Sequence, residues 1–159
     1  MRHGLRNLIA LGSALACLMG GVAVAQDKPS DNMDVMREKL RADKKAVVAE
    51  VLQLTEGEAK AFWPVYNAYQ SDMVTHYDRL LKLLDNYASS YETMTDAQAT
   101  SLLQQYLGLE REHVALLTSY LPRFQKVLPP KKVAKLYQVE NKARALVNYE
   151  LARGIPLVK

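Results

Sequence analysis

The histidines at positions 76 and 113 are the residues whose spacing could do chemistry in this sequence. Each belongs to a series with heptad-like spacing, one being Tyr69, Met73, His76, Leu80, Leu83 and Tyr87, the other Leu102, Tyr106, Leu109, His113, Leu116 and Tyr120. In an antiparallel hairpin that turns around SYETM, facing residues have numbers that add to 189. Tyr69 then faces Tyr120, and His76 faces His113. We therefore predict that the two imidazoles are neighbours.

A facing histidine pair allows three interpretations. With oxygen ligands from Asp72 and Glu110 it could bind zinc or copper, although a structural zinc site usually has four ligands. Two facing imidazoles also resist being charged together, so the pair could respond to pH. Alternatively, the histidines are hydrogen-bonded and packed at the edge of the core. A catalytic di-metal centre is not expected, because such bundles use two Glu-x-x-His motifs and this chain has one. No other cofactor is expected.

The segment FWPVYNAY, residues 62–69, places a proline among aromatic residues within a helical pattern. Pro64 removes a backbone hydrogen bond and costs about 3 kcal/mol in a helix interior. We expect a kink there, offset by burial of the aromatic side chains. The alternative is an aromatic surface in which Phe62, Trp63 and Tyr66 bind a partner.

A second candidate partner-binding surface is basic. Residues 26–112 hold 10 Lys/Arg against 15 Asp/Glu, whereas residues 113–159 hold 9 against 2. The candidate residues are Arg123, Lys126, Lys131, Lys132 and Lys135. They form either a solvated face or a contact for an acidic protein or a membrane surface.

The elements that must position these residues all follow a helical period. We expect four helices, over residues 31–52, 56–88, 96–120 and from PPKK to about Arg153, with a continuation of the third beyond Pro122, through a bend, as the alternative. The fold class is therefore all-α, with antiparallel hairpins arranged as a bundle or cradle. Residues 33–159 form a single helical domain, preceded by a flexible segment over residues 26–32.

Two of the helix starts carry the capping-box pattern, in which a threonine hydroxyl and the side chain three residues later cap each other's backbone amides. The residues concerned are Leu54, Thr55 and Glu58 in the first, and Met94, Thr95 and Gln98 in the second. Each cap contributes about 1 kcal/mol.

These two segments also resemble the LTxxQ motifs of the Spy/CpxP family, small exported helical proteins of Gram-negative bacteria. Glu58 stands in place of the motif's Gln, and Met94 in place of its Leu. The resemblance implies a periplasmic helical hairpin, often a cradle-shaped homodimer. It also implies a role in envelope stress, as an ATP-independent chaperone, an inhibitor of a sensor kinase or part of a metal-linked response.

The N-terminus predicts export. A basic start, MRHGLRN, precedes an apolar run that ends in the small residues AVA before Gln26. We interpret residues 1–25 as a signal peptide cleaved after Ala25, with an uncleaved anchor as the alternative. The mature chain would be periplasmic. It would hold 19 basic and 17 acidic residues, and it would lack Cys17, the only cysteine. It could therefore form no disulfide.

The expected function is binding and not catalysis. No nucleophile with a matched base is apparent, so no catalytic residue is assigned and an enzyme is not expected. The first hypothesis is a chaperone for unfolded or envelope proteins, and the second is a regulatory partner of a membrane sensor, tuned by metal or pH through His76 and His113. A homodimer is compatible with both. A nucleic-acid partner is not expected, because the sequence lacks a motif in which basic residues alternate with aromatic residues that could stack on bases.

Overall fold

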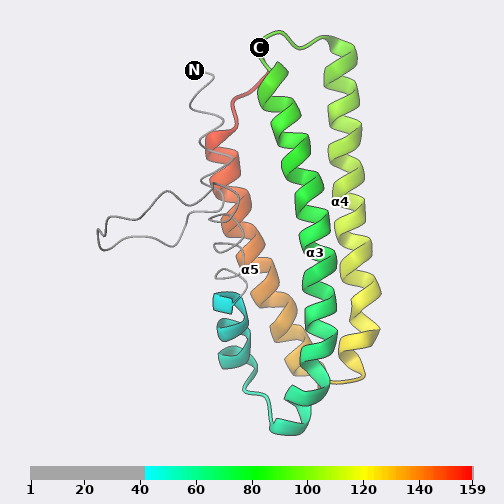
Figure 1. Cartoon of the computed structure of the whole chain (residues 1–159), viewed down its shortest axis with the longest axis vertical. Helices are drawn as coiled ribbons and strands as arrows, with labels where there is room; N and C mark the ends of the chain where they lie inside the picture. The colour runs from blue at the N-terminus through cyan, green and yellow to red at the C-terminus, as the bar shows by residue number, and fades with distance from the viewer. Residues whose placement is uncertain (1–41, 159) are drawn as a thin grey trace, which may run out of the picture.

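The computed structural model describes residues 42–158, and these are helical with short connections and no strand among them (Figure 1). Residues 42–52 are helical, and three long helices follow: α3 over Glu56–Ser90, α4 over Asp96–Gln125 and α5 over Pro130–Gly154. The predicted all-α class is confirmed, as are the helix starts at positions 56, 96 and 130.

Several predictions made for the N-terminal part of the chain lie outside the described residues. These are the signal peptide over residues 1–25, the flexible segment over residues 26–32 and the beginning of the first helix. They stay predictions.

The α3–α4 hairpin is the longest feature of the molecule. In Figure 1 the two helices run side by side in opposite directions, and they make the closest backbone packing, with a smaller contact between α4 and α5. The C-terminal residues return to the far end of α3, where the Tyr87 hydroxyl donates a hydrogen bond of 2.5 Å to the Pro156 carbonyl. The tail is thus anchored at the opposite end of the hairpin from the α4–α5 turn.

Both predicted capping boxes are present. The Thr55 hydroxyl accepts from the Glu58 amide at 3.3 Å, and the Glu58 carboxylate accepts from the Thr55 amide at 2.8 Å. Thr95 and Gln98 repeat the arrangement at 3.3 and 2.9 Å. Helix α5 begins instead with Pro130 in its first turn, as predicted, where a missing amide costs nothing.

The hydrophobic core lies toward the α4–α5 turn and receives side chains from every described helix. Its fully buried members include Val48, Leu52, Phe62, Tyr66, Tyr69, Met73, Phe124 and Leu136. The ring centroids of Tyr69 and Tyr120 are 5.3 Å apart, which confirms the predicted pairing of these residues across the hairpin.

Pro64 lies inside an uninterrupted α3, and Pro122 lies inside α4. The predicted continuation of the third helix past Pro122 is confirmed. The predicted kink at Pro64 stays a prediction. Among residues 42–158, no helix is long and apolar enough to cross a membrane.

The capping boxes lead to a stability prediction. Thr55→Ala and Thr95→Ala should each lower the free energy of unfolding by about 1 kcal/mol, because each leaves an amide of the first helical turn without its acceptor. Urea unfolding followed by circular dichroism measures this. The control is Thr118→Ala, since Thr118 is exposed within α4 and its hydroxyl bonds back to the Val114 carbonyl at 2.8 Å. Equal destabilisation by the control variant would contradict the capping assignment.

Candidate functional site

The two histidines of the predicted hairpin are neighbours. His76 on α3 and His113 on α4 have ring centroids 5.4 Å apart, and each side chain is only 3% exposed. Both Nδ1 atoms are buried and have no hydrogen-bond partner in the described part of the chain. The prediction of adjacency is therefore confirmed, whereas a hydrogen bond at either Nδ1 is not formed.

The four candidate metal ligands are not brought together, because the two carboxylates have other partners. Asp72 accepts a hydrogen bond of 2.6 Å from the Tyr120 hydroxyl, and Glu110 forms an ion pair of 2.6 Å with Arg144 of α5. Within residues 42–158, no group of three or more His, Cys, Asp or Glu is placed to hold a metal ion. The two imidazoles are thus brought together without the oxygen ligands that zinc would need.

Burial controls the protonation of the pair. Desolvation lowers the pKa of His113 to about 4, with the positive charge of Arg144 and the second histidine adding to the effect. Desolvation also lowers the pKa of His76, assisted by Arg79 and partly opposed by Glu112 and Glu110. Both imidazoles are therefore neutral at pH 7.

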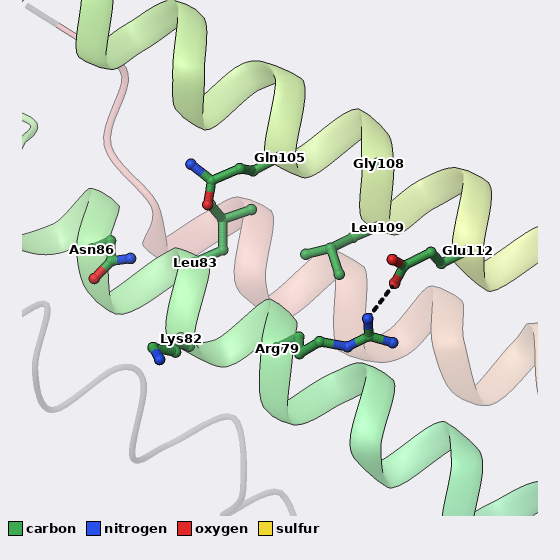
Figure 2. A pocket seen from close by; sticks show the side chains of 8 residues that line it. All are labelled: Arg79, Lys82, Leu83, Asn86, Gln105, Gly108, Leu109 and Glu112. Carbon is green, nitrogen blue, oxygen red and sulfur yellow. Dashed lines mark ion pairs between the residues drawn. The ribbon is translucent and has the colours of Figure 1, made fainter.

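One turn away from the histidines, an open hollow of about 450 Å³ lies between α3 and α4. Figure 2 shows Arg79 of α3 extending toward Glu112 of α4, and their ion pair measures 2.9 Å. Leu83 and Leu109 contribute apolar lining. Because the ion pair is about half exposed, it adds little to stability.

The aromatic candidates belong to the core and not to a binding surface. Phe62 and Tyr66 are fully buried, and the Phe62 ring lies 5.9 Å from that of Phe124. These two side chains are therefore not on a surface that a partner could contact, because the segment around Pro64 packs inward. Trp63 is half-buried against Phe62, with the Lys45 ammonium 6.0 Å from its ring centroid.

The basic candidates divide into two kinds. Lys132 is half-buried and structural: it forms an ion pair of 2.7 Å with Glu58 and donates to the Gln53 carbonyl at 3.0 Å. It therefore joins the start of α5 to the connection that precedes α3. The others are exposed near the α4–α5 turn: Arg123, Lys126, Lys131 and Lys135.

A buried polar cluster, which we call the Glu140 cluster, was not expected from the sequence. Glu140 of α5 is 8% exposed, and its carboxylate accepts from Lys44 at 2.7 Å and from Gln70 at 3.3 Å. The hydroxyls of Tyr66 and Tyr69 donate to it at 3.1 and 3.4 Å. Four donors from two other helical segments thus converge on one carboxylate.

The Glu140 cluster has a clear electrostatic consequence. Desolvation raises the pKa of Tyr66 and of Tyr69 well above the usual range, and the nearby Glu140 charge raises them further. Both hydroxyls therefore stay protonated and act as donors. Lys44 reaches inward to balance the buried charge.

The surface of α4 carries an unexpected line of exposed apolar side chains, which we call the α4 stripe. Its members are Leu103, Leu107, Val114 and Leu121, exposed by 58, 45, 58 and 36%. Steps of four and seven residues place them on one helix face. Glu110 and Leu117 fall between them, and α5 reaches α4 at both, through the Arg144 ion pair and a hydrogen bond of 2.6 Å from the Tyr137 hydroxyl to the Leu117 carbonyl.

Sequence patterns contained signals for both unexpected features. Glu140 stands four residues after Leu136 on the buried face of α5, so a charge there requires a partner. The sequence of α4 contains two apolar lines, the hairpin seam and a second line beside it. The second line is the signal from which the α4 stripe could be predicted.

Comparison with protein-family models, curated proteins and solved structures finds no match. The likeness to the Spy/CpxP family therefore stays a resemblance based on the two capped helix starts.

The Glu140 cluster leads to a second prediction. Lys44→Met should lower the free energy of unfolding by about 2 kcal/mol, because it leaves the buried carboxylate without its only cationic partner among the described residues. Chemical unfolding measures the loss. Arg153→Met is the matched control, since its pair with Glu150 is exposed and should contribute less than about 0.5 kcal/mol. Similar losses in the two variants would contradict the role of the cluster.

A third prediction concerns pH. The pKa of His113 is about 4 in the folded chain and 6.5 in the unfolded chain, so the unfolded chain binds more protons between these two pH values. The free energy of unfolding should therefore fall as pH drops from about 6.5 to 4, by up to about 3 kcal/mol.

His113→Gln should remove this contribution and flatten the difference between pH 7 and pH 4.5, as measured by urea titrations at several pH values. Thr118→Ala, which replaces an exposed side chain of α4 that does not titrate in this range, is the control and should keep the wild-type profile. An unchanged slope in His113→Gln would contradict the buried, neutral state of this imidazole.

Proposed function

We propose that this protein is an exported, Spy/CpxP-like envelope-stress protein that binds unfolded or partner proteins as an ATP-independent chaperone. The single observation that carries the proposal is the α4 stripe, whose four apolar side chains are exposed by 36 to 58%. A line of this kind is a surface on which an apolar segment of another protein can be buried.

The dimensions of the α4 stripe fit such a partner. Leu103 and Leu121 lie about 27 Å apart along the helix, at a rise of about 1.5 Å per residue. That length can hold an apolar segment of an unfolded chain in either an extended or a helical conformation. Aliphatic side chains without a fixed polar group favour tolerance of many sequences over recognition of one.

Charge gives the surface a second property. The exposed basic residues Arg123, Lys126, Lys131 and Lys135 lie near the α4–α5 turn, beyond the Leu121 end of the stripe. They would attract acidic clients and speed their encounter, with an effect that weakens as salt rises.

A regulatory partner of a membrane sensor is the second candidate function. The buried His76–His113 pair favours it, because the pair joins α3 to α4 and could couple a bound ion or a proton to the hairpin. The two candidates predict different behaviour: a chaperone suppresses aggregation of unrelated proteins, whereas a dedicated regulator fails that assay and binds one membrane protein.

The fourth prediction tests the α4 stripe. At near-stoichiometric ratios the wild-type chain should suppress light scattering by two or more unrelated proteins as they unfold. Replacing Leu103, Leu107 and Val114 together by Gln should raise the concentration needed for half suppression at least fivefold, since the variant loses much of its exposed apolar area.

The control combines Leu146→Gln and Tyr149→Gln, which remove exposed apolar side chains from α5, each 61% exposed in the wild type. Circular dichroism and melting should show that both variants keep the wild-type fold, because exposed substitutions rarely change stability. If the control variant loses as much activity as the stripe variant, the assignment to α4 is wrong. If the wild-type chain suppresses no aggregation, the chaperone function itself is wrong.

A further inference from the structure

We propose that His76 and His113 form a binding site for one soft monovalent cation, Cu(I) or Ag(I), held between the two imidazoles across the α3–α4 hairpin. This inference goes beyond the proposed function and does not depend on it. Its basis is the geometry of the pair: ring centroids 5.4 Å apart, 3% exposure of each side chain and two buried Nδ1 atoms without a partner among the described residues.

The first argument concerns the unpartnered nitrogens. A buried polar atom without a hydrogen bond costs about 1–3 kcal/mol, and native chains keep few of them. Here two such atoms occur on side chains that face each other from different helices. A cation bound between the rings would use a lone pair from each imidazole and would offset the cost at the nitrogens that coordinate it.

The second argument concerns the number of ligands. Zn(II) in proteins takes four ligands at a structural site and at least three protein ligands at a catalytic one. Glu110, Glu112 and Asp72 are engaged by Arg144, Arg79 and Tyr120. Two imidazoles alone do not satisfy Zn(II), whereas filled-shell monovalent ions such as Cu(I) and Ag(I) accept two nitrogen ligands on opposite sides.

The third argument concerns charge and softness. The cost of burying an ion grows steeply with its charge, so a site with no free carboxylate from residues 42–158 favours a monovalent ion. The nearby ion pairs each combine one positive and one negative group and so add no net charge. Met73 is buried one helical turn before His76 on α3, and its thioether is a soft group of the kind that suits Cu(I).

The consequence of binding would be mechanical as well as chemical. Each imidazole belongs to a different helix, so a bound ion would link α3 to α4 at the middle of their shared seam. An ion that binds only the folded chain raises its melting temperature. The site would thus make the stability of the hairpin depend on the concentration of a soft metal ion.

The experiment uses the predicted mature chain, residues 26–159, which lacks the silver-binding thiol of Cys17, and silver nitrate in a chloride-free buffer. Calorimetric titration should show one high-affinity Ag(I) per chain, and the melting temperature should rise at saturation. His76→Gln and His113→Gln should each weaken the affinity at least tenfold and abolish the rise in melting temperature. Thr118→Ala, a substitution of an exposed side chain on the same helix as His113, is the control and should bind as the wild type does.

Nitrogen-15 NMR of the wild-type imidazoles keeps the test decisive if a variant fails to fold. Addition of one equivalent of Ag(I) should shift a ring nitrogen of both His76 and His113. The proposal is overturned if neither ring shifts, or if the two variants bind Ag(I) as tightly as the wild type. It is also overturned if Zn(II) binds this pair as tightly as Ag(I) does.

Discussion

The buried carboxylate of Glu140 is the constraint on which the arrangement of the helices depends. A charge that is 8% exposed must be surrounded by donors, or folding would lose several kcal/mol. Lys44 supplies the counter-charge from the segment over residues 42–52, while Tyr66, Tyr69 and Gln70 donate from α3. Because these donors lie on two helical segments, their hydrogen bonds together restrict where α5 can lie.

This constraint separates a rigid end of the molecule from a more open one. Near the α4–α5 turn, the aromatic core, the Glu140 cluster and the Lys132–Glu58 ion pair lie together. Farther along, α5 reaches α4 through Arg144 and Glu110, and Leu146 and Tyr149 beyond that point are largely exposed. The histidine pair lies between these regions, next to the open hollow.

Local and periodic features of the fold could be predicted from the sequence, whereas polar contacts between residues far apart in the sequence could not. The caps at Thr55 and Thr95 are local, so three residues specify each. The pairing of His76 with His113 follows from helical periodicity and a single turn. Lys44 and Glu140, by contrast, are 96 positions apart, and nothing in their spacing identifies them as partners. The partners of Asp72 and Glu110 could not be predicted for the same reason. They are Tyr120 and Arg144, and these contacts depend on the placement of side chains in three dimensions.

The same placement of α5 explains why an apolar line stays exposed on α4. Glu140 fixes the first half of α5 over the core, and the contacts of Tyr137 and Arg144 with α4 fall at Leu117 and Glu110. The members of the stripe are nevertheless 36 to 58% exposed, so these contacts do not cover it. Burying Leu107 and Val114 under α5 at the expense of the hydrogen bonds to Glu140 would leave a buried carboxylate without its donors. An unpaired buried carboxylate costs more free energy than burial of two partly exposed aliphatic side chains would gain. The exposed stripe is therefore the lower-energy arrangement.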